Sequence, residues 1–262
     1  MMRLKLLLSY VGSRYSGWQI QEKPSPPPTV QGTLESALRT VAGQAVRAHA
    51  AGRTDAGVHA HGQVAHADIP DAKSGLNWQR SLNALLPQDI SVLNAVAAPP
   101  GFHARKDALH KTYIYHFWQE RAFVPPHLAP FVWPCGPLDA DAMREGMAHL
   151  PGTRNFSTLR NAGTDMESSV RTVFSATLCS MPPCEYYPPH APLLRFTVVA
   201  DGFLKQMVRN MAGLLAACGQ GKIPPDAIPG LLATEDRRAL PSVTAPAQGL
   251  ALARVDYAPT TA

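Results

Sequence analysis

The sequence predicts an α+β fold with a mostly antiparallel sheet, and three observations support that class. Predicted strands and helices do not alternate one for one, as they would in a parallel, doubly wound sheet. Each half of the chain reads roughly as a strand, a helix and further strands. With 262 residues, 45% of them hydrophobic, the chain can bury a substantial core without disulfides.

The elements of the first half follow from hydrophobic patterning. A Leu-rich run predicts a buried strand from Arg3 to Val11, and the Pro-rich stretch from Pro24 to Pro28 predicts a loop. Apolar residues at helical spacing predict a helix from Val30 to Val41, with Thr29 as its cap. The other elements expected in this half are short strands at 45–50 and 62–68, a helix at 76–86 that ends before Pro87, and a strand at 90–97.

The second half begins with a predicted strand at 111–118 and a Pro-rich linker at 124–137. Asp139 suits the start of a helix that we expect at 139–149. Asp201 and Gly202 introduce the clearest helix of the chain, which has an apolar face and is closed by glycines. The remaining predicted elements are strands at 170–180, 193–200 and 250–257, with a Pro-rich loop at 182–192 between the first two.

Charge and cysteine content restrict the classes of function. The net charge of +5 and a pI near 9.1 are compatible with a polyanionic partner without proving one. The scattered cysteines indicate ordinary thiols in a reducing compartment; they are Cys135, Cys179, Cys184 and Cys218. The first apolar run is short and is broken by Lys5, so we expect neither a signal peptide nor a membrane span. The expected location is the cytoplasm.

The segment AGRTDAGVHA, from Ala51 to Ala60, is the clearest candidate site. Arg53 and Asp55 are two residues apart, so both side chains point to the same side if the segment is extended. Gly52 and Gly57 allow a turn with positive φ or the close approach of a ligand. The pattern favours a functional site. The alternative is an Arg–Asp pair that only holds a tight turn.

GRTDAGVHA resembles the signature of the TruA family of tRNA pseudouridine synthases, in which the Asp is the catalytic residue. Nine blocks occur in the family's order and cover nearly the whole chain. Besides the signature they are GSRYSGWQIQ, VQGTLESAL, GQVAH, LNALLPQDISV, FHAR, KTYIY, DGFLKQMVRNMAGLL and APAQGLAL.

The resemblance implies an isomerase that converts uridine to pseudouridine at positions 38, 39 and 40 in the anticodon stem and loop of tRNA. It implies two α+β subdomains, 1–105 with the GRTD loop and 106–262 with the active-site Tyr and Arg. In the family the two are joined into one sheet, with the active site in the cleft between them. The resemblance also implies a homodimer. The reaction makes no net change of atoms, so no cofactor is expected.

Asp55 is the predicted catalytic residue, because a carboxylate is ionised at neutral pH and can attack the base or the sugar or remove a proton. The sequence leaves open whether Asp55 adds to the base, attacks C1′ or assists glycal formation. By resemblance, Arg209 is the partner that orients Asp55, and Arg53 is an RNA contact. The alternative for Lys205 and Arg209, four residues apart, is a solvated helix face.

Tyr113, in KTYIY, matches the family's active-site tyrosine, whose ring could stack on a flipped base. Tyr115 has the same strand parity and could be confused with it, and a core position is the alternative for either ring. Arg105, in FHAR, is predicted to bind RNA phosphates. Neighbouring basic residues extend this phosphate track; they are His103, Lys106 and Lys111. The first loop offers further RNA contacts or structural pairing through Arg14, Tyr15, Trp18, Gln19 and Gln21.

Three histidines near the signature, His59, His61 and His66, lack further ligands at zinc spacing, so a hydrogen-bonding or exposed role is favoured and no metal is expected. Val11 stands where the family usually has an acidic residue, and Arg154 with Asn155 replaces the common His-Asp.

Two other functions are possible for such a chain. One is an RNA-binding module that has lost the chemistry, and the other is a glycosidase, which would need a second acid opposite Asp55.

Overall fold

The computed structural model describes residues 1–22, 25–163, 168–181 and 193–259, and the chain divides into two compact units. The first unit comprises Met1–Leu109 and Ala251–Ala262, and the second comprises His110–Leu250. This division differs from the predicted subdomains 1–105 and 106–262 at the C-terminus. The reason is that the last strand, β10 (Leu250–Tyr257), pairs in parallel with β3 (His59–Ile69) of the first unit, a long-range pairing that no local pattern reveals.

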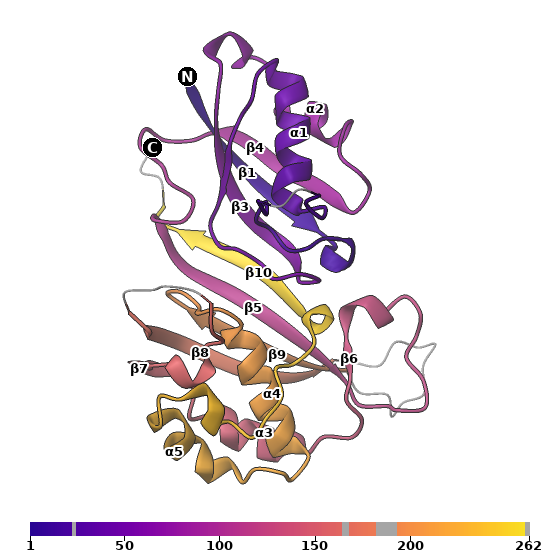
Figure 1. Cartoon of the computed structure of the whole chain (residues 1–262), viewed down its shortest axis with the longest axis vertical. Coiled ribbons are helices and arrows are strands. Elements are labelled where there is room, and N and C mark those ends of the chain that lie inside the picture. The colour runs from indigo at the N-terminus through magenta and orange to yellow at the C-terminus, as the bar shows by residue number, and fades with distance from the viewer. Residues whose placement is uncertain (23–24, 164–167, 182–192, 260–262) are drawn as a thin grey trace. The chain divides into compact units, whose positions relative to one another are not determined.

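The first unit is built on a sheet in the order β4-β1-β3-β10 (Figure 1). Strand β1 (Met2–Tyr10) is antiparallel to both β3 (His59–Ile69) and β4 (Ile90–Ala97), and β2 (Ala48–Ala50) is antiparallel to β3. Buried and partly buried residues alternate along β1, so one face of the sheet is core.

Two helices accompany this sheet: α1 (Val30–Ala42) packs against α2 (Trp78–Asn83) and β2, and α2 packs against β4. Thr29 caps α1 as predicted, since its side chain accepts a hydrogen bond from Gly32 N at 3.2 Å. Helix α2 is shorter than predicted, because Leu85 N and Leu86 N both bond to Leu82 O and close a tight turn.

The second unit contains the order β5-β9-β8-β7, in which every neighbouring pair is antiparallel. The strands are β5 (Ala108–Trp118), β9 (Leu193–Ala200), β8 (Val170–Met181) and β7 (Gly152–Asn155), with β6 (Trp133–Pro134) parallel to β5. Helix α3 (Ala140–Met147) packs against both β8 and α4 (Met207–Gly219), and α5 (Ile228–Ala233) follows them. The predicted α+β class and the mostly antiparallel pairing are confirmed.

Short 3₁₀ helices connect these elements at several turns. They lie at Gly12–Arg14, Asp71–Lys73, Ala129–Phe131, Ser157–Leu159, Pro225–Ala227, Arg237–Ala239 and Ala247–Gly249. In the part of the chain that the structure covers, no helix combines the length and apolarity that crossing a membrane requires.

Helix α4 differs from the prediction in two ways. It begins at Met207 and not near Gly202, because Gln206 adopts a left-handed backbone with φ of 60° and ends any helical run before it. Lys205 therefore precedes the helix, and the prediction that Lys205 and Arg209 share a helix face is wrong. The helix is also buried on nearly every side, so Arg209 does not belong to a solvated face.

The cysteines that the structure describes are free thiols, with Cys135 and Cys218 buried and Cys179 exposed. Burial raises the pKa of the Cys135 thiol to about 11, and the pKa of Cys218 is raised to the same value for the same reason. Cys184, the Pro-rich loop at 182–192 and Pro24 lie outside the described residues.

Candidate active site

The GRTD segment is a loop between β2 and β3 that ends in a tight turn. Val58 N donates to Asp55 O at 3.1 Å and closes the turn, and Gly57 has a φ of +79°, the left-handed conformation predicted for it. Gly52 does not adopt positive φ. The turn therefore needs one of the two predicted glycines for its backbone conformation.

Side chains alternate across this loop. Arg53 is exposed, Thr54 is buried and Asp55 is half-buried. This alternation is that of an extended segment, with Thr54 directed into the core and Arg53 and Asp55 on the other side of the chain. The Asp55 carboxylate and the Arg53 guanidinium can therefore both reach the same ligand.

Thr54 and Gly52 fix the loop to the sheet below it. The hydroxyls of Thr54 and Tyr10 share a hydrogen bond of 2.8 Å, and Gln63 Nε2 donates to Gly52 O at 2.8 Å. Burial raises the pKa of Tyr10 to about 12, so its hydroxyl stays protonated at neutral pH. The carboxylate of Asp55 thus projects from a backbone that is held on both sides.

Two glycines of the GSRYSGW block let the first loop lie directly against the Asp55 turn. A Cβ on Gly17 would lie 2.6 Å from Thr54 O, and one on Gly12 would lie 2.0 Å from Val58 O. Both distances are too short for real contacts, so any larger residue would displace the loop. Structural pairing, one of the two roles predicted for side chains of this block, is present at Tyr15, whose hydroxyl donates to Asp89 Oδ1 at 2.6 Å.

Arg105 lies in the same unit, on a turn held by histidines. His66 Nδ1 accepts from Ala104 N at 3.1 Å, and His103 Nδ1 accepts from Arg105 N at 3.1 Å. Burial, and then the neighbouring His103, lower the pKa of His66 to about 4, so the ring is neutral and able to accept. The exposed side chains of Arg105 and Lys106 project from this fixed turn.

Histidine at the signature also serves as a hydrogen-bond acceptor. The buried His59 accepts from Gly12 N through Nδ1 at 3.0 Å, which agrees with the hydrogen-bonding role predicted for these histidines. Within the described ranges, no group of three His, Cys, Asp or Glu side chains is arranged to hold a metal ion.

Tyr113 and Tyr115 are distinguished by their contacts within the second unit. Both are buried on β5, but the hydroxyl of Tyr115 donates to Pro246 O at 2.8 Å, and its ring lies where a Cβ on Gly249 would be. Tyr115 is thus a core residue. Tyr113 meets the ring of Phe203 edge to face, with centroids 5.0 Å apart. Phe203 was not predicted as a partner, although it lies in the quoted DGFLKQ block.

Arg209 is half-buried on α4 and is tied to the APAQGL block. Its Nε donates to Ala245 O at 2.7 Å, and its backbone carbonyl accepts from Ala245 N at 3.1 Å. A Cβ on Gly213, one helical turn further, would lie 1.9 Å from Val243 O. Close packing of α4 on residues 243–245 therefore directs the guanidinium.

The predicted site residues fall into two groups. Arg53 and Asp55 share one loop of the first unit, with Arg105 on a separate turn of that unit, whereas Tyr113 and Arg209 belong to the second unit.

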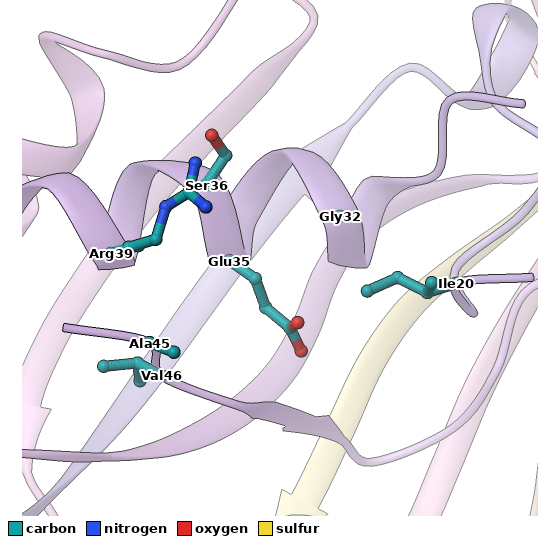
Figure 2. Close-up of a pocket in the computed structure, with 7 residues that line it drawn as sticks. All are labelled: Ile20, Gly32, Glu35, Ser36, Arg39, Ala45 and Val46. Carbon is teal, nitrogen blue, oxygen red and sulfur yellow. The ribbon is translucent and has the colours of Figure 1, made fainter. Parts of the chain in front are cut away.

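Figure 2 shows a pocket of about 300 Å³ in the first unit, between α1 and the segment that leads into β2. None of the predicted site residues lines it. Its acidic residue, Glu35, accepts from Gln31 Nε2 and from Ala48 N, each at 2.9 Å, so this carboxylate holds β2 to α1. The pocket is lined by Ile20, Gly32, Glu35, Ser36, Arg39, Ala45 and Val46.

This chain is similar to known proteins along nearly its whole length. The family described as tRNA pseudouridine synthase matches residues 7–105 and 147–258. The tRNA pseudouridine synthase A of Oleidesulfovibrio alaskensis is 51% identical, with 98% of this chain and 97% of that protein covered. The protein of the same name from Nitratidesulfovibrio vulgaris strain Miyazaki F is 50% identical, over 98% and 100% of the two chains. In Geobacillus kaustophilus a protein of this name is 42% identical, over 97% and 94%. The chain therefore belongs to the tRNA pseudouridine synthases, the isomerases that convert uridine in tRNA to pseudouridine.

Proposed function

We propose that this enzyme isomerises uridines at positions 38, 39 and 40 in the anticodon stem and loop of tRNA. The observation that carries the proposal is the Asp55 turn, which presents a half-buried carboxylate on a backbone fixed by hydrogen bonds. Relatives named tRNA pseudouridine synthase A support the substrate class, and the order of the nine sequence blocks supports the anticodon arm.

Asp55 is the proposed catalytic residue. In the reaction the C1′–N1 bond breaks, the uracil turns, and a C5–C1′ bond forms, while the proton on C5 is lost and N1 gains one. A carboxylate can begin this sequence by adding to the base, by attacking C1′ or by removing a proton toward a glycal. Each route requires the ionised oxygen atoms to be held at one place, which the fixed turn provides.

The proposed substrate-binding residues are Tyr113, Arg53, Arg209 and Arg105. A base in a stem must leave the stack before it can react, and Tyr113, whose ring meets Phe203 edge to face, is the residue proposed to stack on it. The exposed Arg53 and Arg105 are suited to RNA phosphates. The pairing of Arg209 with Asp55 that the resemblance implies stays a prediction.

The proposed partners are the tRNA and a second copy of the chain, and the proposed location is the cytoplasm. Light scattering of the purified protein tests the homodimer, for which the expected mass is twice that of the 28.2 kDa chain. A monomeric mass at micromolar concentration would contradict the homodimer.

The proposed function is tested with unmodified tRNA transcripts that carry uridine at position 38, 39 or 40, or at none of them. We expect pseudouridine at each of the three positions and no product in the transcript that lacks all three uridines. Product confined to other positions would contradict the proposed site. A protein that binds the transcripts without forming any pseudouridine would instead be the RNA-binding module.

A further inference from the structure

The segment 11–18 contacts the Asp55 turn on both sides of the carboxylate. Trp18 N donates to Thr54 O at 3.0 Å, on the residue before Asp55. Tyr15 O accepts from Gly57 N at 3.2 Å, two residues after it. Any shift of this segment is therefore passed to the backbone that carries the carboxylate.

Tyr15 is itself held by a residue far away in the sequence. Its hydroxyl donates to Asp89 Oδ1 at 2.6 Å, and the backbone carbonyl of Asp89 accepts from Val11 N at 2.9 Å. Asp89 therefore fixes the segment at its beginning, through Val11, and at its centre, through Tyr15. Tyr15 is buried, and the side chain of Asp89 is only 16% exposed.

Burying a carboxylate for a purely structural contact costs free energy of folding. The second oxygen, Asp89 Oδ2, is buried with no hydrogen-bond donor, and the nearest cation is the exposed Arg14 guanidinium at 3.7 Å. An incompletely paired buried charge opposes folding. In return, a hydrogen bond to an ionised acceptor is shorter and more strongly directed than one between neutral groups. The Tyr15–Asp89 hydrogen bond therefore fixes the geometry of segment 11–18 at a cost in folding stability.

We infer that Tyr15 and Asp89 are positioning residues for the isomerisation, because their hydrogen bond fixes the Tyr15 carbonyl that holds Gly57 and thereby orients Asp55. The inference rests on the proposed role of Asp55. Tyr15 and Asp89 act through the turn and are assigned no contact with the RNA. Burial, and then the Asp89 carboxylate, raise the pKa of Tyr15, so its hydroxyl remains a donor at neutral and mildly alkaline pH.

The test is the split between kcat and KM in the Tyr15→Phe variant, which keeps the buried ring and removes only the hydroxyl. We expect kcat to fall about tenfold or more, since displacement by roughly 1 Å can slow an enzyme about a hundredfold. KM for tRNA and the Kd measured by filter binding should stay within about twofold.

Variants at Asp89 separate an effect of the hydrogen bond on kcat from a general effect on folding. Asp89→Asn keeps a neutral acceptor oxygen for the Tyr15 hydroxyl and should lose less kcat than Tyr15→Phe, whereas Asp89→Leu should lose as much as Tyr15→Phe. The double variant Tyr15→Phe/Asp89→Leu should be no slower than the slower single variant, because both changes remove the same hydrogen bond.

Thr158→Val is the matched control, since it also removes a fully buried hydroxyl that donates to a backbone carbonyl, that of Leu232, at nearly constant volume. It should lower the melting temperature as Tyr15→Phe does but leave kcat within about twofold. Wild-type kcat in Tyr15→Phe, or an equal loss in Thr158→Val, would overturn the inference. So would a Tyr15→Phe variant that raises KM alone. A wild-type protein that forms no pseudouridine would instead remove the proposed function, and this inference with it.

Discussion

The loop that carries Asp55 and the helix that carries Arg209 are held in place by different means. The loop has no regular structure, and its position depends on individual hydrogen bonds from Tyr10, Gln63 and segment 11–18. Helix α4 is held by its nearly complete burial and by a polar network centred on Asn210. One lost hydrogen bond should therefore affect activity first in the loop and stability first in the helix.

The largest effect among tests of this comparison is expected at Arg209. Arg209→Ala removes the guanidinium but leaves α4 buried, so we expect turnover to fall about a hundredfold or more with tRNA binding mostly kept. Single-turnover rates and filter binding measure the two quantities. Equal loss of turnover and affinity would mean that Arg209 is chiefly an RNA contact. Arg144→Ala, at an exposed ion pair on α3, is the control.

The next effect concerns stability in the second unit. Asn210 is fully buried, donates to Leu159 O at 2.8 Å and to Asn161 Oδ1 at 2.9 Å, and accepts from Thr244 Oγ1 at 2.7 Å. Asn210→Leu removes these three hydrogen bonds from a fully buried position and should lower the free energy of unfolding by about 3 kcal/mol in urea titrations.

Thr54→Val is the counterpart in the loop. It removes the hydrogen bond to Tyr10 at nearly constant volume and should lower the free energy of unfolding by only about 1 kcal/mol. Its kcat should nevertheless fall at least about tenfold. A variant that loses stability and keeps its full kcat would break the comparison.

Arg105 should show a smaller effect, confined to affinity. Because its exposed side chain is proposed to neutralise one phosphate, Arg105→Ala should weaken tRNA binding roughly three- to tenfold and reduce the slope of log Kd against log salt by about 1. Filter binding over a series of salt concentrations gives the slope. An unchanged slope would mean that Arg105 makes no phosphate contact.

The smallest effect is a pH dependence of stability at the turn that carries Arg105. The folded-state pKa of His66 is lowered to about 4 from an ordinary 6.5, so the unfolded chain binds the proton more readily. The resulting stability is fully present above pH 6.5 and is lost as the pH falls toward 4. Urea midpoints at pH 7.5 and 5.0 should differ less in His66→Gln than in the wild type. An equal difference in both proteins would remove His66 as the cause.

Much of the fold could be predicted because apolar patterns are local. Strands β4, β9 and β10 match their predicted bounds, and Thr29 caps α1 as expected. The start of α4 could not be predicted, since no pattern reveals that Gln206 adopts a left-handed backbone. The parallel pairing of β10 with β3 joins distant parts of the chain and was missed for that reason.

The candidate site shows the same division between local and distant features. A turn with positive φ was one of the two possibilities predicted for Gly52 and Gly57, and Gly57 adopts it. The Tyr15–Asp89 hydrogen bond spans 74 residues, and no motif connects its two partners. Phe203 was visible in the DGFLKQ block, but only the structure shows that its ring meets Tyr113.

The role proposed for Asp55 is to isomerise uridine in tRNA with a carboxylate that its turn holds in place. Its most direct test is the single-turnover rate of pseudouridine formation in Asp55→Asn, with the exposed Asp141→Asn as control. We expect a rate below about one thousandth of the wild-type rate, with tRNA binding and melting temperature unchanged. An Asp55→Asn variant that forms pseudouridine at the wild-type rate would contradict it.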